Sequence, residues 1–342
     1  MKSAVLRAPT HVRWVVDIGP ERVAAVAGQR EASGRIRVLG AGEAPRRGFA
    51  AGEVTHTGDA VESVCEALRR AESTAGLKAT DVLYNCSAGP LTSSWRHASR
   101  LLSGEGQVKA PDVRSTRETA ERLESRFERR ILYAKELYFI VDDRDTMAQP
   151  LGVFGRKLEA VVHLVSVGAE SLEAYQKVFR RAGFVGARPV LSLQSSAAAI
   201  ADNEDPIQRR LLVDASAESV GVCVQRAGVL WRCAMTRSPE PDAVAAVLGE
   251  LEKDCECDRE VLLTGQFAED ETYRSALQSA CGRPVRVVSP VDVPGLERAR
   301  YASLAGLFKV QVPSRRPALL KVRRGSIAEL RERAAAFFNE YF

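Results

Sequence analysis

Two segments of this chain share one pattern: an apolar strand that ends near an aspartate, a short polar turn, and a second apolar strand. The first segment runs from Trp14 to Val26 with Asp17 before its turn, and the second runs from Leu211 to Val224 with Asp214 before its turn. Such turns can offer backbone N–H groups to a phosphate where glycine lets the backbone come close. Because the pattern recurs in two halves of the chain, the sequence predicts a duplicated architecture with a shared site.

The two turns are poorly suited to holding a phosphate. The first keeps Gly19 but continues with Pro20, which has no N–H to donate, and Glu21, whose charge repels an anion. The second reads Ala215-Ser216-Ala217-Glu218 and has no glycine before Gly221. We therefore expect weak phosphate binding at best.

Two roles remain open for Asp17 and Asp214. They could help to hold a hydrated Mg²⁺ ion, or they could simply end their strands and make turn hydrogen bonds. The altered turns favour the second role. Among the seven cysteines the only close pair is Cys255-Glu256-Cys257, which lacks the two-residue spacer of most zinc sites. We expect no metal site and no catalytic residue.

Composition places the chain among ordinary soluble proteins. It has 342 residues, of which 45% are hydrophobic and 27% are charged, which suffices for two domains. Apolar runs are too short to span a membrane, and the amino terminus is too short and polar for a signal peptide. Seven scattered cysteines indicate reduced thiols in a cytoplasm.

The alternation of elements predicts layered α/β structure. A helix is expected at 58–75 and a charged helix at 115–130, where mixed arginines and glutamates indicate a solvated face rather than a nucleic-acid surface. His163 lies in an apolar strand at 158–167 and is expected to be a core residue rather than a catalyst.

The last part of the chain combines a basic linker with an amphipathic segment. From Lys309 to the end there are eight basic and three acidic residues, a difference that equals the net charge of +5 of the whole chain. Residues 311–326 are expected to be a linker that includes Arg323 and Arg324, and residues 327–342 a helix. Its apolar face and end are formed by Ile327, Leu330, Ala334, Phe337, Phe338, Tyr341 and Phe342.

This segment suits an anionic membrane surface. Each basic residue near such a surface contributes about 1 kcal/mol, and aromatic side chains insert into the interface. The alternative is a helix that docks on the protein's own core or on a partner, which the three glutamates of the polar face favour.

The chain resembles FtsA, the actin homologue of bacterial cell division. The resemblance is carried in order by residues 16–26 (first phosphate motif), 45–54 (the Ser-Arg-Gly…Gly-Val loop), 150–160 (the Pro-Val-Gly-Leu-Ser-Gly stretch), 262–265 (adenosine motif) and 301–307 (connecting helix). It covers nearly the full length. PilM, a pilus-assembly cousin, shares the same arrangement.

The resemblance implies an actin-like (ribonuclease H-like) two-domain α/β fold with an inserted 1C-type subdomain. The implied parts are domain 1 (1A) at 1–88 and 161–205, the 1C-type subdomain at 89–160, domain 2 (2A only) at 206–310, the linker at 311–326 and the terminal amphipathic helix at 327–342.

Departures from the family pattern fall on the nucleotide site. Residues 215–218 replace a Gly-Gly-Gly-Thr motif, 266–268 replace glycines of the adenosine motif, and Ser192 stands where the family often has an acid. Fifty residues separate Asp214 from Thr264, too few for the 2B-type subdomain that covers the base and receives FtsZ.

What is left is a weak remnant of a nucleotide and magnesium site, formed by Asp17, Gly19, Asp214 and Gly265. Hydrolysis of ATP requires positioned phosphate, Mg²⁺ and water. The resemblance and its departures together predict a pseudo-ATPase with no cofactor.

The expected function is a membrane-tethered scaffold or adapter in bacterial cell division or envelope assembly. It would be cytoplasmic, peripheral on the inner face of the cell membrane, and would bind a division or envelope-assembly protein through residues 89–160. FtsZ-like binding is in doubt, self-association is possible, and no nucleic acid is expected.

One alternative is an ATP-binding polymer former with Asp17 and Asp214 near Mg²⁺. Another is a PilM-like adapter that captures a short peptide.

Overall fold

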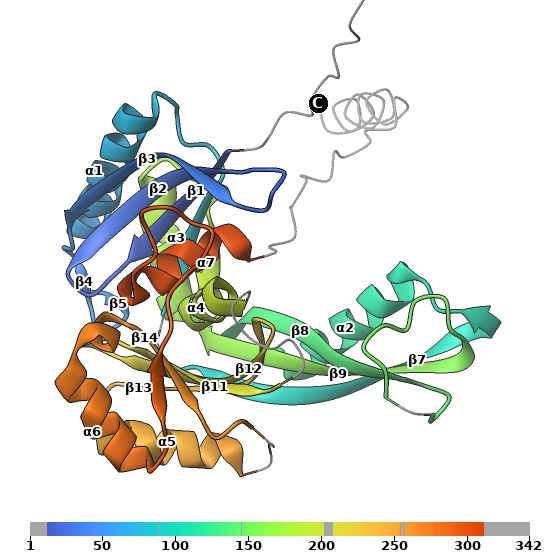
Figure 1. Ribbon diagram of the computed structural model, residues 1–342. Coiled ribbons are helices and arrows are strands. Elements are labelled where there is room, and N and C mark those ends of the chain that lie inside the picture. Colours follow the sequence, from blue (N-terminus) through green and yellow to red (C-terminus); the bar gives the residue numbers. More distant parts are fainter. Residues whose placement is uncertain are drawn as a thin grey trace, which may run out of the picture. The chain divides into compact units, whose positions relative to one another are not determined.

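The structure is a computed structural model that describes residues 12–310, except for 88, 145, 202–207, 254 and 256 and the side chains of 104 and 105. Within this range the chain forms two five-stranded sheets, a three-stranded sheet and a short two-stranded ribbon, with helices on the larger sheets (Figure 1).

The first sheet belongs to the amino-terminal half. Its strands run in the order β10-β6-β1-β2-β3, where β1, β2 and β3 are antiparallel neighbours and β6 and β10 run parallel to β1. The strands are β1 (Val12–Ile18), β2 (Arg22–Arg30), β3 (Ile36–Pro45), β6 (Val82–Cys86) and β10 (Arg188–Leu191), and the ribbon is β4 (Phe49–Ala50) with β5 (Glu53–Val54).

The second sheet repeats this topology. Its order is β13-β12-β11-β14-β15, again with three antiparallel strands followed by two parallel ones. The strands are β11 (Arg210–Ala215), β12 (Val220–Arg226), β13 (Val229–Thr236), β14 (Val261–Gly265) and β15 (Val285–Val287). The duplicated two-domain fold predicted from the paired segments is confirmed, because β1–β2 and β11–β12 hold equivalent places in the two sheets.

Helices cover the outer faces of both sheets and fill the space between them. In the first half α1 and α3 close a core around Trp14, Tyr84 and Phe179, while α5 and α6 pack together beside the second sheet. The helices are α1 (Thr57–Ala75), α3 (Ala169–Arg181), α4 (Ser192–Ile200), α5 (Pro241–Glu252), α6 (Glu271–Cys281) and α7 (Ala302–Lys309), with 3-10 turns η2 (Gln266–Glu269) and η3 (Ala299–Tyr301). None of the helices in the described part of the chain is long and apolar enough to cross a membrane.

Helices α4 and α7 cross at backbone contact. A Cβ atom placed on Gly306 of α7 would lie 1.7 Å from the carbonyl oxygen of Ser195 in α4. This close crossing positions Ser196 and Ser303, one from each helix, toward the space between the two sheets.

The third sheet is an insertion between β6 and α3. It has the order β7-β9-β8, formed by β7 (Thr92–Gln107), β8 (Arg129–Val141) and β9 (Phe154–Gly168), with α2 (Ala110–Glu124) packed on it. Strand β9 pairs along its length with β7 and β8, so the predicted boundary at residue 160 falls inside this strand.

The charged helix predicted at 115–130 is shifted, since α2 spans 110–124. It begins earlier because Pro111 fits a first helical turn and the Asp112 carboxylate accepts a hydrogen bond of 3.0 Å from the backbone N–H of Lys109. It ends earlier because the chain from Arg129 onward pairs with β9.

Side chains of the third sheet cover the free edge of β13. Tyr133 Oη accepts a hydrogen bond of 3.0 Å from the Leu230 N–H, and His163 Nδ1 donates one of 2.9 Å to the Leu230 carbonyl. Ser93 Oγ accepts a hydrogen bond of 3.2 Å from Cys233 N–H and donates to His163 Nε2 at 2.8 Å. Backbone groups of Leu230 and Cys233 at this edge thereby have hydrogen-bond partners, and the insertion is attached to the second sheet.

His163 is completely buried in this contact, as predicted for a core residue. Burial lowers its pKa to about 4, so the imidazole is neutral at physiological pH and can both donate and accept.

Candidate functional site

A small cavity of about 100 Å³ lies where the turns of the two duplicated hairpins meet. Asp17, Gly19, Asp214 and Gly265 all line it. The structure thus brings together the four residues that the sequence proposed as the remnant of a nucleotide site.

Asp17 is held by donors from the first half and from α7. Its carboxylate accepts hydrogen bonds from Asn85 Nδ2 and Ser303 Oγ, and Asn85 Oδ1 in turn accepts one of 2.7 Å from the Ile18 N–H. Burial, helped by the negative charge of Asp214, raises the pKa of Asp17 to about 6 despite these hydrogen bonds.

Asp214 is partly buried at the end of β11 and faces the cavity. Its carboxylate accepts a hydrogen bond from Ser196 Oγ, and burial raises its pKa while this hydrogen bond opposes the shift. Gly265 lies against it with φ 90°, and a Cβ atom there would come within 2.5 Å of both Asp214 Oδ1 and the Ala215 carbonyl. Only glycine fits this close approach.

Backbone N–H groups of the turns are used inside the protein. In the first turn Gly19 N–H donates to the Arg22 carbonyl at 3.0 Å, and Pro20 has no N–H. In the second turn Ser216 N–H donates to the Ser219 carbonyl at 3.1 Å. Donors that could otherwise face a phosphate are therefore already engaged.

Gln266, the first residue of η2, connects the two turns. Its Nε2 donates a hydrogen bond of 3.2 Å to Glu21 Oε1 in the first turn. Its Oε1 accepts one of 3.2 Å from the Ala217 N–H in the second turn. One neutral side chain thus spans the gap between the hairpins.

A second connection is ionic. Arg46 makes a bidentate ion pair with Glu218, at 2.6 Å and 2.7 Å, and also donates 2.9 Å to the Pro20 carbonyl. The Arg46 side chain is 8% exposed and that of Glu218 32%. The Glu218 carboxylate, an anion supplied by the protein itself, therefore binds Arg46 at the second turn.

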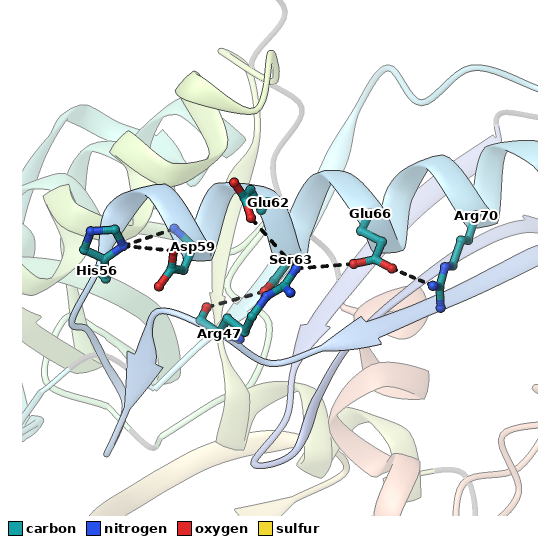
Figure 2. Close-up of polar contacts among 7 residues, drawn as sticks. All are labelled: Arg47, His56, Asp59, Glu62, Ser63, Glu66 and Arg70. Carbon is teal, nitrogen blue, oxygen red and sulfur yellow. Dashed lines mark hydrogen bonds and ion pairs between the residues drawn. The ribbon is translucent and has the colours of Figure 1, made fainter.

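The loop that presents Arg46 is fastened to α1 (Figure 2). The backbone N–H of Arg47 donates 3.0 Å to Ser63 Oγ, and the Arg47 guanidinium lies 3.5 Å from Glu66. Gly48 has φ 74°, and a Cβ there would come within 2.2 Å of the His56 carbonyl. Because the loop is fixed, Arg46 is held toward the cleft while Arg47 is held toward the helix.

Sequence reasoning did not identify the residues that complete this site. Asn85, Ser196 and Ser303 carry no local pattern, and Arg46 meets Glu218 across 172 residues of chain. Gln266 had a signal, since it stands where the family pattern has glycine.

The predicted membrane-binding residues lie outside the described part of the chain. Arg323, Arg324 and the apolar positions of 327–342, namely Ile327, Leu330, Ala334, Phe337, Phe338, Tyr341 and Phe342, therefore remain predictions.

Solved structures share the fold of this chain. One is the PilM–PilN type IV pilus biogenesis complex, with a TM-score of 0.60, 15% identity, and coverage of 88% of this chain and 98% of that one. Another is the ethanolamine utilization protein EutJ from Carboxydothermus hydrogenoformans, with a TM-score of 0.51, 12% identity, and coverage of 89% and 91%. At these identities the likeness shows the fold alone.

Sequence comparison identifies the inserted sheet. Residues 89–166 match the family described as the SHS2 domain inserted in FtsA. The cell division protein FtsA of Pseudomonas aeruginosa is 24% identical over 291 residues, and that of Escherichia coli K12 is 22% identical over 303 residues. The chain is an FtsA-like actin homologue. The third sheet with α2 is accordingly its SHS2 domain.

Coverage of the relatives is partial. These matches include 84% and 87% of the FtsA-like chain but 67% and 71% of the two relatives. For the Neisseria meningitidis FtsA, 26% identical over 216 residues, the shares are 63% and 52%. What the whole relatives do is therefore not carried over with the similarity.

Proposed function

We propose that this FtsA-like protein is a membrane-tethered scaffold or adapter in bacterial cell division or envelope assembly that works without nucleotide. The observation that supports this most strongly is the cleft itself. Gln266 and the Arg46–Glu218 ion pair bridge the two turns where phosphates would otherwise lie.

The dimensions of the cleft support the same conclusion. Its cavity is about 100 Å³, below the roughly 300–1,000 Å³ of typical ligand pockets. In the described residues between Asp214 and Thr264, the elements are β12, β13 and α5. This content agrees with the absence of a 2B-type subdomain. Because that subdomain is the part of FtsA that receives FtsZ, we do not propose FtsZ binding in the usual mode.

Membrane tethering rests on the sequence of the last 34 residues. They carry the whole net charge of +5 and end in an apolar, aromatic helical face. Such a segment is attracted to anionic lipids and inserts its apolar face. The protein would then be cytoplasmic and peripheral on the inner face of the membrane.

The SHS2 domain is the proposed surface for a division or envelope-assembly protein and for self-association. It projects from the duplicated body in Figure 1 and is attached to β13 through His163 and Tyr133. An ATP-binding polymer former is the competing function, since Asp17 and Asp214 still face one cavity. It would require Gln266 and Arg46 to leave their partners.

Liposome co-sedimentation with and without Mg-ATP tests the proposal. We expect equal binding to anionic liposomes in both conditions, and loss of binding when Arg323 and Arg324 are changed to Glu and Phe337 and Phe338 to Ser. A matched Arg180→Glu/Arg181→Glu variant on α3 serves as the control. Binding that requires ATP, or that survives the four changes, would contradict the proposal.

A further inference from the structure

A second cavity lies along β8, where the SHS2 domain meets the β12–β13 hairpin. Its volume is about 370 Å³, within the range of ligand pockets. Its lining includes Lys135, Leu137 and Phe139 of β8 and Arg226, Val229 and Trp231 of the hairpin. We call this feature the β8 groove.

The floor of the β8 groove is formed by buried apolar side chains. Leu137, Phe139 and Trp231 are 8%, 5% and 7% exposed. An occupant that reaches this floor would bury apolar side chains against aromatic rings.

The rim of the groove carries positive charge without compensation. Lys135 and Arg226 have no carboxylate partner among the described residues. The guanidinium groups of Arg226 and Arg209 both lie over the Trp231 ring, at 5.6 Å and 4.2 Å from its centre. The one acid that lines the groove, Glu136, lies 3.4 Å from Arg117 and is ion-paired. An acidic ligand would complement these cations.

Strand β8 is an edge strand beside this groove. It pairs with β9 on one side, and on its other side one isolated bridge joins Phe139 to Met147. The edge of β13, by contrast, is covered by side chains of the SHS2 domain, as with Leu230. An exposed edge strand is a template for an added strand.

We propose that the β8 groove binds an extended acidic peptide of a partner protein, which adds as a strand beside β8 and places apolar side chains on Leu137 and Trp231. This inference rests on the proposed adapter function and specifies its partner chemistry. A basic segment such as residues 309–342, with a net charge of +5, would be a poor charge match for Lys135 and Arg226, which favours an acidic occupant.

Selection from a random 12-residue peptide library displayed on phage tests this assignment on the full chain. We expect selected peptides to be rich in Asp and Glu alternating with apolar residues. Synthetic copies should bind at least about tenfold more weakly to Lys135→Glu/Arg226→Glu. The charge-matched control Arg181→Glu/Arg237→Glu, exposed and outside the groove, should bind as the unchanged protein does.

Hydrogen exchange supplies a readout of the binding mode. Amides of residues 134–140 should gain protection when a selected peptide is bound. Peptides that are basic or uncharged, or that bind the groove variant unchanged, would overturn the groove, as would failure to select any. Unchanged liposome binding in the same preparation separates these outcomes from failure of the scaffold function.

The chain's own acids at 202–205 are tested as a competing occupant. If acidic peptides are selected only when Asp202, Glu204 and Asp205 are neutralised, the occupant of the groove is the chain's own acidic segment. That result would overturn the proposal of a partner peptide. Equal selection on both proteins supports the proposal.

Discussion

The Glu218 side chain is the anionic partner of Arg46 at the second turn. Its carboxylate is 32% exposed, whereas its partner Arg46 is 8% exposed, so loss of the carboxylate leaves a largely buried guanidinium without its counterion. We expect Glu218→Gln to lower the free energy of unfolding by about 1–3 kcal/mol, measured by urea denaturation. Glu250→Gln, which removes an exposed pair with Lys253, is the control and should cost under about 0.5 kcal/mol. Equal effects of the two changes would show that the ion pair does not fasten the cleft.

Asp17 gives the cleft a defined dependence on pH. Its pKa is about 6 in the folded protein against 3.8 ordinarily, so the folded state binds more protons between these values. This residue therefore contributes stability that is present below about pH 4 and is lost as the pH rises through 6.

Asp17→Asn removes the ionisation but keeps an acceptor for Asn85 and Ser303. We expect it to raise the free energy of unfolding at pH 8 by roughly 1–3 kcal/mol and to leave it nearly unchanged at pH 4. Urea denaturation across this range provides the measurement. Destabilisation at pH 8 would indicate that the charged carboxylate holds the cleft together.

The paired aspartates could be placed from sequence because each follows an apolar strand before a turn. Arg46 and Gln266 could not, since their partners are fixed only by how the two halves pack. Gln266 reaches Glu21 across 245 residues of chain, and no local pattern encodes such a contact.

Helices α4 and α7 meet so closely that Gly306 has no room for a side chain. Gly306→Ala would place a methyl group 1.7 Å from the Ser195 carbonyl and force the helices apart. We expect a loss of about 1–3 kcal/mol or more in the free energy of unfolding, measured by urea denaturation. Gly249→Ala in α5, where nothing lies within 4 Å of the added atom, should be neutral or stabilising by up to about 1 kcal/mol. A neutral Gly306→Ala would mean that the crossing is looser than described.

Strands were harder to predict than helices where burial gave no pattern. Helix 58–75 is confirmed closely by α1, because Val64 and Leu68 repeat at helical spacing on a buried face. Strand β7 was missed, since its sequence from Thr92 to Gln107 is mostly polar and is held by pairing with β9. The end of α2 was misplaced for the same reason, because pairing of β8 overrides local helix propensity.

The molecule combines a duplicated actin-like body with an SHS2 domain fixed to its second half. An actin-like protein that binds ATP can use the cleft as a switch, because the nucleotide connects the two halves. In this FtsA-like chain Gln266 and the Arg46–Glu218 pair make that connection without ligand. We therefore propose a body that does not respond to nucleotide, with its specificity in the SHS2 domain and its tail.

Isothermal titration of the full chain with Mg-ATP and Mg-ADP tests this account most directly. We predict no saturable heat up to millimolar nucleotide, for the unchanged protein and for the control Gly249→Ala. Saturable binding with a micromolar dissociation constant would contradict the account, and would mean that Gln266 and Arg46 yield their places to phosphate.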